Sequence, residues 1–281
     1  MIKLALPSKG RLLEPTIELL SSCGYQVGKR VGSLSCVDDE NDIEFYFLRP
    51  VDIPVYVSDG TLDAGVTGKD FVAEQGEPMS CLLDLGFGHS KLCAAVAQGR
   101  DIPDLRNSTG PMRVATAFPT ITRAYFGSDR FKIVELEGSV EVSVKLGIAD
   151  AIVDVVETGN SMQQAGLKIV GEPVFLSSAA VFCHPGRETL PELVTLLSRL
   201  KGKMVANEYM MVEYDVPEDT LTEACAITPG IQSPTIMTLD MRHWFSVKSV
   251  VRKKEANRVM DELARLGCKG IILTRIESAR M

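Results

Sequence analysis

The chain has 281 residues, of which 45% are hydrophobic and 24% are charged, and its formal net charge is -7. This composition is typical of a globular chain and argues against wholesale disorder, a collagen repeat or a coiled coil. Its longest apolar runs fall far below the roughly 18 residues that a membrane helix needs, so we expect no membrane span and no membrane partner. At about 150 residues per domain, the length suggests roughly two domains.

The first 180 residues predict strands that alternate with helices. Short β-branched runs separate helical stretches here, a pattern typical of βα units around parallel sheets. The expected strands or extended segments are 2–6, 43–48, 81–85, 92–97, 113–117, 132–136, 151–156 and 174–183. Pro15, Pro119 and Ser139 open the expected helices. The last extended run is long enough to return to the first sheet, so we expect two lobes with a cleft, and ligands of such sheets bind beyond the carboxyl ends of the strands.

From about residue 210 the expected order changes to strand, helix, strand, strand, helix, strand. Pro217 opens the first helix, and the second has an apolar face that ends at Gly267. This βαββαβ order predicts a small ferredoxin-like module. The expected strands are 210–216, 235–239, 245–251 and 271–276. The expected parts of the chain are a first lobe of residues 1–90 plus 180–208, a second lobe of residues 91–179, and a C-terminal domain of residues 209–281.

Cysteine and histidine spacing bears on location and on metal binding. The seven cysteines are scattered with no CxxC pair, so neither a zinc site nor a disulfide framework is indicated. The first apolar run reaches the polar segment 7–11 before a signal-peptide core could form. The three histidines share no ligand spacing. We expect a cytoplasmic protein with buried free thiols and without a histidine-bound metal.

The C-terminal segment 241–281 is basic, with ten Lys and Arg residues against four acidic ones. Such a segment invites a nucleic-acid interpretation. It offers only Trp244 and Phe245 for base stacking, however, and lacks the glycine-aromatic signature of an RNA-recognition sheet. We therefore interpret the charge as a solvated helix face and expect no nucleic-acid partner.

The strongest local signal follows the expected strand 151–156. Asp154 lies near the end of this strand, and Thr158, Gly159 and Ser161 follow where a short helix opens. Free N–H groups at a helix start can hold a phosphate, a glycine permits its close approach, and the hydroxyls add donors. Asp154 can then accept hydrogen bonds from ribose hydroxyls. The pattern predicts a sugar-phosphate loop, and the alternative is an ordinary strand-turn-helix with a capping hydroxyl.

A second carboxylate precedes this loop. Ser139 can cap the helix that follows it, which places Glu141 in the first turn, where the helix dipole favours an anion. By itself Glu141 indicates only a stabilised helix start. Close to Asp154, it would be the second carboxylate beside a ribose or a metal ion.

Three basic or glycine-rich loops, 7–11, 48–50 and 67–70, each follow a strand of the first lobe. Taken singly, each fits a solvated turn. Together they would face the same rim of the cleft, and an acidic protein that handles polyphosphates needs such local positive charge. The chain has no GxSxG, P-loop or GxGxxG motif, which argues against hydrolase, NTPase and Rossmann dehydrogenase functions.

These loops, in this order, resemble ATP phosphoribosyltransferase, the first enzyme of histidine biosynthesis. The resemblance runs through the chain, and its C-terminal part is similar to the long form of the enzyme, which carries its own regulatory domain. The stretches that carry it are Pro-Ser-Lys-Gly-Arg-Leu at 7–12, Phe-Leu-Arg-Pro at 47–50, Leu-Asp-Ala-Gly-Val-Thr-Gly at 62–68, the segment 141–147, Asp150, Asp154, the segment 158–162 and the segment 226–236.

The resemblance implies a reaction in which N1 of the ATP adenine displaces pyrophosphate from C1 of phosphoribosyl pyrophosphate, with Mg2+. It implies an α/β fold with a two-lobed core like that of solute-binding proteins, the type IV phosphoribosyltransferase-like core, plus the ferredoxin-like domain. The partners that it implies are ATP, phosphoribosyl pyrophosphate, histidine as inhibitor and further copies of this chain in dimers and hexamers. No separate regulatory subunit is expected.

Site residues are also implied by the resemblance, although no metal ligand is. They are Glu141 and Asp154 for catalysis; Lys9, Arg49, Asp70, Thr158, Gly159, Asn160 and Ser161 for substrate binding; and Asp215, Ser233, Thr235 and Gly270 for histidine. Two positions depart from the family pattern. Ser161 stands where Thr is usual and keeps the hydroxyl, and Gly270 stands where relatives often have Ala near the inhibitor.

Two other classes share parts of this pattern. A solute-binding protein for a small anion would have the same two lobes, but it has no need for Asp154 and the hydroxyl-rich segment beside Glu141. A salvage-type phosphoribosyltransferase has a similar phosphate loop, but its motif has two adjacent acids where this chain has Asp154 and Val155.

Overall fold

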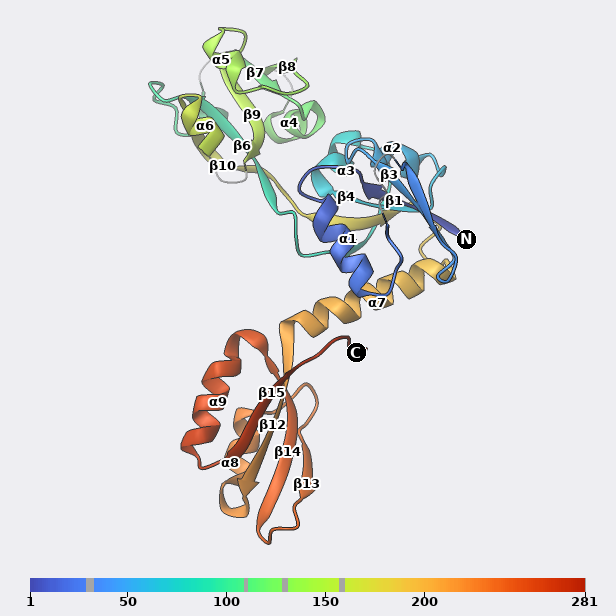
Figure 1. Ribbon diagram of the computed structural model, residues 1–281. Coiled ribbons are helices and arrows are strands. Elements are labelled where there is room, and N and C mark those ends of the chain that lie inside the picture. The colour runs from blue at the N-terminus through green and yellow to red at the C-terminus, as the bar shows by residue number, and fades with distance from the viewer. Residues whose placement is uncertain (29–32, 109–110, 128–130, 157–159, 281) are drawn as a thin grey trace. The chain divides into compact units, whose positions relative to one another are not determined.

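The computed structural model describes residues 1–28, 33–108, 111–127, 131–156 and 160–280, and of Asn160 and Ser161 only the backbone. The chain divides into two compact units, Met1–Val194 and Thr195–Met281. The labels of helices and strands are those of Figure 1. Within the described ranges, no helix is both long and apolar enough to span a membrane.

The first sheet of the first unit has six strands in the order β2-β3-β1-β4-β11-β5. Its three neighbours β3, β1 and β4 are parallel, whereas β2, β11 and β5 pair antiparallel to their neighbours. The strands are β1 (Ile2–Pro7), β2 (Ser35–Asp38), β3 (Ile43–Leu48), β4 (Ala64–Gly68), β5 (Ser80–Asp84) and β11 (Ala179–Cys183), and the helices are α1 (Leu13–Ser22), α2 (Ile53–Ser58) and α3 (Lys69–Gln75). All five residues of β4 are buried, as is typical of a parallel strand covered on both faces.

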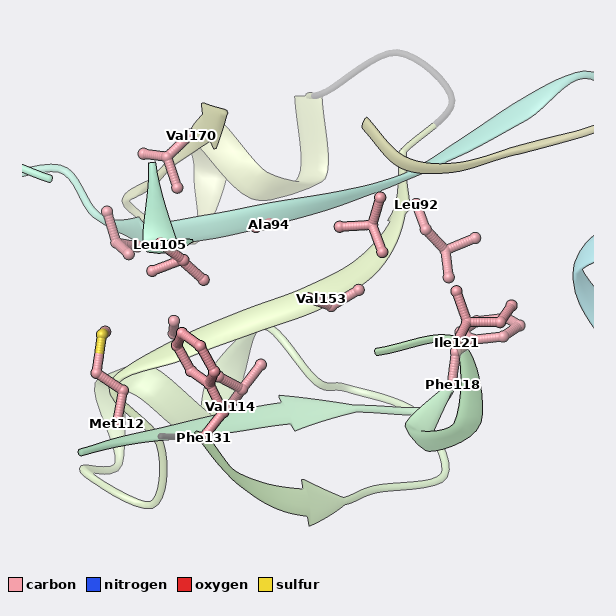
Figure 2. Packing of buried hydrophobic residues seen from close by; sticks show 13 residues of the cluster. Leu92, Ala94, Leu105, Met112, Val114, Phe118, Ile121, Phe131, Val153 and Val170 are labelled. Atoms are coloured by element: carbon pink, nitrogen blue, oxygen red, sulfur yellow. The ribbon is translucent and has the colours of Figure 1, made fainter. Parts of the chain in front are cut away.

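The second sheet has five strands in the order β10-β6-β9-β7-β8, with β7 parallel to β8 and β9. The strands are β6 (Ser90–Ala97), β7 (Met112–Thr116), β8 (Phe131–Glu135), β9 (Ala151–Val156) and β10 (Leu167–Ser177), and the helices are α4 (Pro119–Phe126), α5 (Val142–Lys145) and α6 (Asn160–Gln164). Both faces are buried. Leu92, Val114 and Val153 pack with Phe118 and Ile121 on one side (Figure 2), and the alternate strand residues face a second cluster.

The chain passes between the two sheets twice. The first passage follows β5, and the second lies at Ser178, which separates β10 in the second sheet from β11 in the first. The expected return of segment 174–183 to the first sheet is thus confirmed, but the segment is two strands and not one. At this point Ser178 donates a hydrogen bond to Asp84 (2.7 Å), and the Lys69 ammonium lies 2.5 Å from the same oxygen.

Burial by itself would raise the pKa of Asp84, but hydrogen bonds from Lys69, the Gly86 N–H and Ser178 outweigh it and lower that pKa to about 2. Asp84 is therefore ionised at neutral pH. Its two oxygens accept hydrogen bonds from residues at the start of α3, after β5 and between β10 and β11, so that one carboxylate connects both passages of the chain.

Helix α3 follows strand β4 of the first sheet but also packs against the second sheet. Phe71 lies 6.1 Å from Phe118 between ring centroids, and it contacts the hydrophobic cluster of the second sheet. The Glu74 carboxylate accepts hydrogen bonds from the N–H groups of Thr120 (2.8 Å) and Ile121 (3.1 Å). These are first-turn N–H groups of α4, which have no partner within the helix, so Glu74 supplies the cap that the helix lacks locally.

The second unit has a four-stranded antiparallel sheet in the order β13-β14-β12-β15. Its strands are β12 (Tyr209–Pro217), β13 (Thr235–Thr238), β14 (Trp244–Arg252) and β15 (Lys269–Arg275), its helices α8 (Leu221–Ile227) and α9 (Ala256–Arg265), and α7 (Pro191–Glu208) precedes them. The first and third strands are central, as in a split βαβ module, which confirms the ferredoxin-like prediction. A helical segment begins directly after Pro217, as expected: a 3-10 turn over Glu218–Thr220 leads into α8 at Leu221, while Pro217 itself is the last residue of β12.

We expect Glu74→Ala to lower the free energy of unfolding by about 1 kcal/mol, because two α4 N–H groups lose their acceptor. Urea denaturation of the full chain measures this. Glu77→Ala, at an exposed position soon after α3, is the matched control and should change stability by less than about 0.5 kcal/mol. Equal effects of the two substitutions would contradict a capping role for Glu74.

Candidate active site and effector site

Asp154 lies on β9, between β6 and β7 at the middle of the second sheet. Its side chain is half-buried, and Oδ1 accepts a hydrogen bond from the Val155 N–H at 2.7 Å. Burial raises the pKa of Asp154, the Val155 N–H opposes this rise, and the negative charge of Glu141 adds to it. Glu141 is therefore close enough to Asp154 to influence its charge, which is the condition under which the sequence analysis considered it as a second carboxylate.

Glu141 reaches this position through a shorter helix than expected. Ser139 has a φ of 48°, in the left-handed region, and so lies outside the helix. Helix α5 begins at Val142, and Glu141 occupies its N-cap position. The expected helix start and capping role of Ser139 are wrong. Glu141 nevertheless remains at the N-terminal end of the helix.

The predicted sugar-phosphate segment is described only in part. Thr158 and Gly159 lie outside the described residues, and so do the side chains of Asn160 and Ser161. The short helix expected after the loop is present as α6, which begins at Asn160. Met162 in this helix is buried in the second cluster beneath the sheet, so packing fixes where the helix starts relative to β9.

Lys9 and Arg49 follow β1 and β3, which are parallel neighbours, and both side chains are exposed at the same edge of the first sheet. Arg49 makes two hydrogen bonds to Asp52, from Nε at 2.8 Å and from Nη2 at 3.1 Å. The bond to Asp52, its charge and the charge of Glu137 in the loop after β8 raise the pKa of Arg49. Lys9 in turn helps to lower the pKa of Asp52, after the larger effect of the Arg49 hydrogen bond. Asp52, which was not predicted as a site residue, thus interacts with both basic residues, through hydrogen bonds with Arg49 and through the charge of Lys9.

Asp70 is fully buried in the first turn of α3, so the expected loop at 67–70 is the end of β4 and the start of this helix. Its N–H donates to Ser177 Oγ at 3.1 Å, and its Oδ1 accepts from the Phe71 N–H. Among the described residues Oδ2 has no hydrogen-bond partner, and Arg11 Nη2 lies 3.7 Å away. The Arg11 guanidinium therefore compensates part of the charge of this buried carboxylate. Arg11 belongs to the basic loop 7–11 of the sequence analysis but was not predicted individually as a site residue.

In the second unit, Asp215, Thr235 and Gly270 of the residues predicted for histidine lie on one sheet. Asp215 alternates with the core residue Tyr214 on β12 and so points to the face opposite the helices. A Cβ at Gly270, which has a φ of 54°, would lie 3.5 Å from Asp215 Oδ2, so these two residues are neighbours. A bulge between β12 and β15 accompanies this approach.

Thr235 is two strands away from Asp215 on the same face. It pairs with Lys248 of β14, and Lys248 pairs in turn with Glu213 of β12, to which its ammonium lies at 2.5 Å. Ser233 is exposed in the preceding loop, where its hydroxyl donates to the Pro234 carbonyl at 3.3 Å. Asp215, Gly270 and Thr235 therefore share one face of the sheet, with Ser233 at its edge.

We expect Glu141→Gln to lower the pKa of Asp154, because the substitution removes the nearby like charge. The carboxyl ¹³C shift of Asp154 against pH, in protein labelled at aspartate, measures this. Glu137→Gln, at an exposed position in the same loop, is the matched control and should leave that titration unchanged. An Asp154 titration that is the same in Glu141→Gln and in wild type would mean that the two carboxylates do not interact.

Comparison with known proteins finds matches in both units. A family model described as ATP phosphoribosyltransferase matches residues 49–202, and a model described as HisG, C-terminal domain matches residues 206–278. Proteins named ATP phosphoribosyltransferase from Salinispora tropica and Micrococcus luteus are 40% and 43% identical to this chain, each over 100% of both chains.

One solved structure is similar at the level of fold and sequence. It is titled ATP phosphoribosyl transferase (HisG:HisZ) complex from Thermotoga maritima, and the alignment has a TM-score of 0.62 at 31% identity and covers 72% of this chain and 97% of that chain. The family model spans more than half of the chain, and the relatives match it from end to end. The chain belongs to the ATP phosphoribosyltransferase family.

Proposed function

We propose that this protein transfers the 5-phosphoribosyl group from phosphoribosyl pyrophosphate to N1 of ATP, giving phosphoribosyl-ATP and pyrophosphate, and that histidine inhibits it. This reaction is the first step of histidine biosynthesis. The observation that carries the proposal is the match to the family and to its full-length relatives, and the carboxylates Glu141 and Asp154 support it.

The chemistry needs little from a base. Adenine N1 is a lone-pair nucleophile at neutral pH, so the N1–C1 bond forms as the C1–O bond breaks, and the electron pair leaves with pyrophosphate. Positive charge develops at ribose C1, where Asp154 and Glu141 would stabilise it, and negative charge develops on pyrophosphate, where Lys9 and Arg49 would. Positioning of the two anionic substrates supplies the remainder of the acceleration.

Mg2+ fits these residues as a partner of the substrate. Within the described part of the chain no three His, Cys, Asp or Glu side chains form a metal cluster. Two carboxylates together with substrate phosphates are a donor set that Mg2+ uses. Bound there, Mg2+ would neutralise charge on the pyrophosphate group. We expect Glu141 and Asp154 to be the protein groups closest to it.

The remaining assignments follow from this proposal. Residues 1–90 with 180–208, and residues 91–179, would form the two catalytic lobes, and residues 209–281 the regulatory domain. The relative of known structure is titled as a complex with HisZ, whereas this chain matches a C-terminal HisG domain of its own, which supports self-contained regulation in a homo-oligomer. The thiols of Cys93, Cys183 and Cys268 are buried, although that of Cys81 is exposed, and unpaired thiols suit the cytoplasm.

We expect Asp154→Asn to fold normally and to lower turnover at least about tenfold, which is on the order of 1.4 kcal/mol of transition-state stabilisation. The assay mixes the chain with ATP, phosphoribosyl pyrophosphate and Mg2+ and follows the ultraviolet change of N1-substituted adenine. Asp101→Asn, at an exposed position in the same sheet's loops, is the control and should keep wild-type turnover. Wild-type turnover in folded Asp154→Asn would refute the role of Asp154, and a wild-type chain that binds both substrates without forming product would favour the solute-binding alternative.

For the effector site, we expect the double substitution Ser233→Ala with Thr235→Ala to raise the histidine concentration for half-inhibition at least about tenfold, because hydrogen bonds to a charged ligand are typically worth about 1.5–3 kcal/mol. Turnover without histidine should stay unchanged. Thr238→Ala is the matched control, since Thr238 is exposed at the other end of β13. Unaltered inhibition in the double variant would place the histidine site elsewhere.

A further inference from the structure

The helix-covered face of the sheet in the second unit contains a chain of buried polar groups. Tyr214, Thr228 and Ser249 are 1%, 0% and 4% exposed. The hydroxyls of Tyr214 and Thr228 lie 2.7 Å apart, and the Ser249 hydroxyl donates to the Thr228 carbonyl at 2.7 Å. Around them the core is apolar, so each of these groups would be costly without its partner. We call these three residues the buried relay.

The buried relay joins segments that are distant in sequence. Tyr214 immediately precedes Asp215 on β12, and Ser249 lies on β14, the strand between β12 and β13. Thr228 follows α8 and opens the loop 228–234, which carries Ser233 and leads into β13 at Thr235. The histidine site has Asp215 on one side and the Ser233 loop on the other. The buried relay is joined to both, through Tyr214 next to Asp215 and through Thr228 at the start of the loop.

Thr228 holds the base of this loop through two further hydrogen bonds. Its N–H and its hydroxyl both donate to the Ala224 carbonyl, at 3.2 and 3.1 Å, which ends α8. Burial raises the pKa of Tyr214 to about 12, so its phenol stays protonated at neutral pH and keeps its hydrogen bond with Thr228. The base of the loop is therefore tied to the helix, to β12 and to β14.

The loop also passes directly over Ser249. Gly230 has a φ of 71°, and a Cβ there would lie 3.0 Å from Ser249 Oγ and 3.2 Å from the Ser233 carbonyl oxygen. The Ser249 hydroxyl is thus hydrogen-bonded to the start of the loop and lies close to Gly230, and the turn brings Ser233 back toward Gly230. Beyond this point the loop is exposed, as Ile231, Gln232 and Ser233 show.

We propose that Tyr214, Thr228 and Ser249 are positioning residues for the effector, which hold the Ser233 and Thr235 side of the histidine site at a fixed place relative to Asp215. The inference rests on the proposed function, since it assumes that histidine binds to these residues. A loop that is held before binding loses less conformational entropy when the ligand arrives. The buried relay therefore raises affinity for histidine without touching it and has no part in the transfer reaction.

The decisive comparison is Thr228→Val against Thr228→Ser in the full-length chain. Val has the shape of Thr but removes the hydroxyl that Tyr214 contacts, whereas Ser keeps it. Calorimetry with histidine, together with inhibition at fixed ATP and phosphoribosyl pyrophosphate, measures the effect. We expect Thr228→Val and Ser249→Ala to raise the Kd for histidine at least fivefold, Thr228→Ser to stay within twofold of wild type, and turnover without histidine to be unchanged in all three.

Val259→Ala controls for a loss of stability alone. Val259 is a buried α9 residue in the same core, and its truncation should lower Tm without changing the Kd for histidine. If Val259→Ala weakens histidine binding as much as Thr228→Val does, the relay is merely structural and the proposal is wrong.

Two other results separate this proposal from the one on which it rests. A wild-type chain that binds no histidine would overturn the proposed regulation and the relay with it. A wild-type chain that binds histidine, with Thr228→Val binding equally well, would overturn the relay alone. If Thr228→Val does not fold, Tyr214→Phe, which removes one hydroxyl and keeps the ring, carries the same expectation and decides the question.

Discussion

The passage of the chain between its two larger sheets is the constraint on which the proposed active site depends. Asp84 ends β5 before the first passage, Ser178 lies at the second, and one carboxylate oxygen accepts hydrogen bonds from both Ser178 and Lys69. Lys69 is the first residue of α3. In the same helix, Phe71 packs against the core of the second sheet and Glu74 accepts hydrogen bonds from the start of α4. The edge of the first sheet and the end of β9 therefore belong to one connected framework.

The charges of that framework are divided between the sheets. Lys9 and Arg49 lie at the edge of the first sheet, and the acidic pair of Glu141 and Asp154 lies on the second. On the proposed reaction this matches the substrate, since pyrophosphate gains negative charge while ribose C1 gains positive charge. Two carboxylates that repel each other in the free protein would both be stabilised by a positive charge between them, whether that of Mg2+ or the charge that develops at ribose C1.

The two faces of the sheet in the second unit have different roles: one packs in the core, and the other carries the residues proposed to bind histidine. Alternation along β12 sends Tyr214 into the core and Asp215 to the opposite face. Polar groups on the buried face must be hydrogen-bonded to one another, and this fixes their positions. Polar groups on the exposed face can instead bind a ligand. A glycine at 270, in the left-handed region and next to Asp215, leaves room on that open side.

The amino-acid sequence by itself determined the elements with a regular apolar pattern. Strands 43–48 and 151–156 and the βαββαβ order were predictable because side-chain periodicity is local. It also singled out Asp154, near the end of its strand, and Glu141, at the start of a helix, as candidate carboxylates. Strand β2 and the actual start of α5 were not predictable, because pairing with β3 sets the first and the backbone turn at Ser139 sets the second. Only the tertiary structure showed which residues meet across long separations, such as Asp84 with Ser178 and Tyr214 with Thr228, because no local pattern encodes a contact between distant segments.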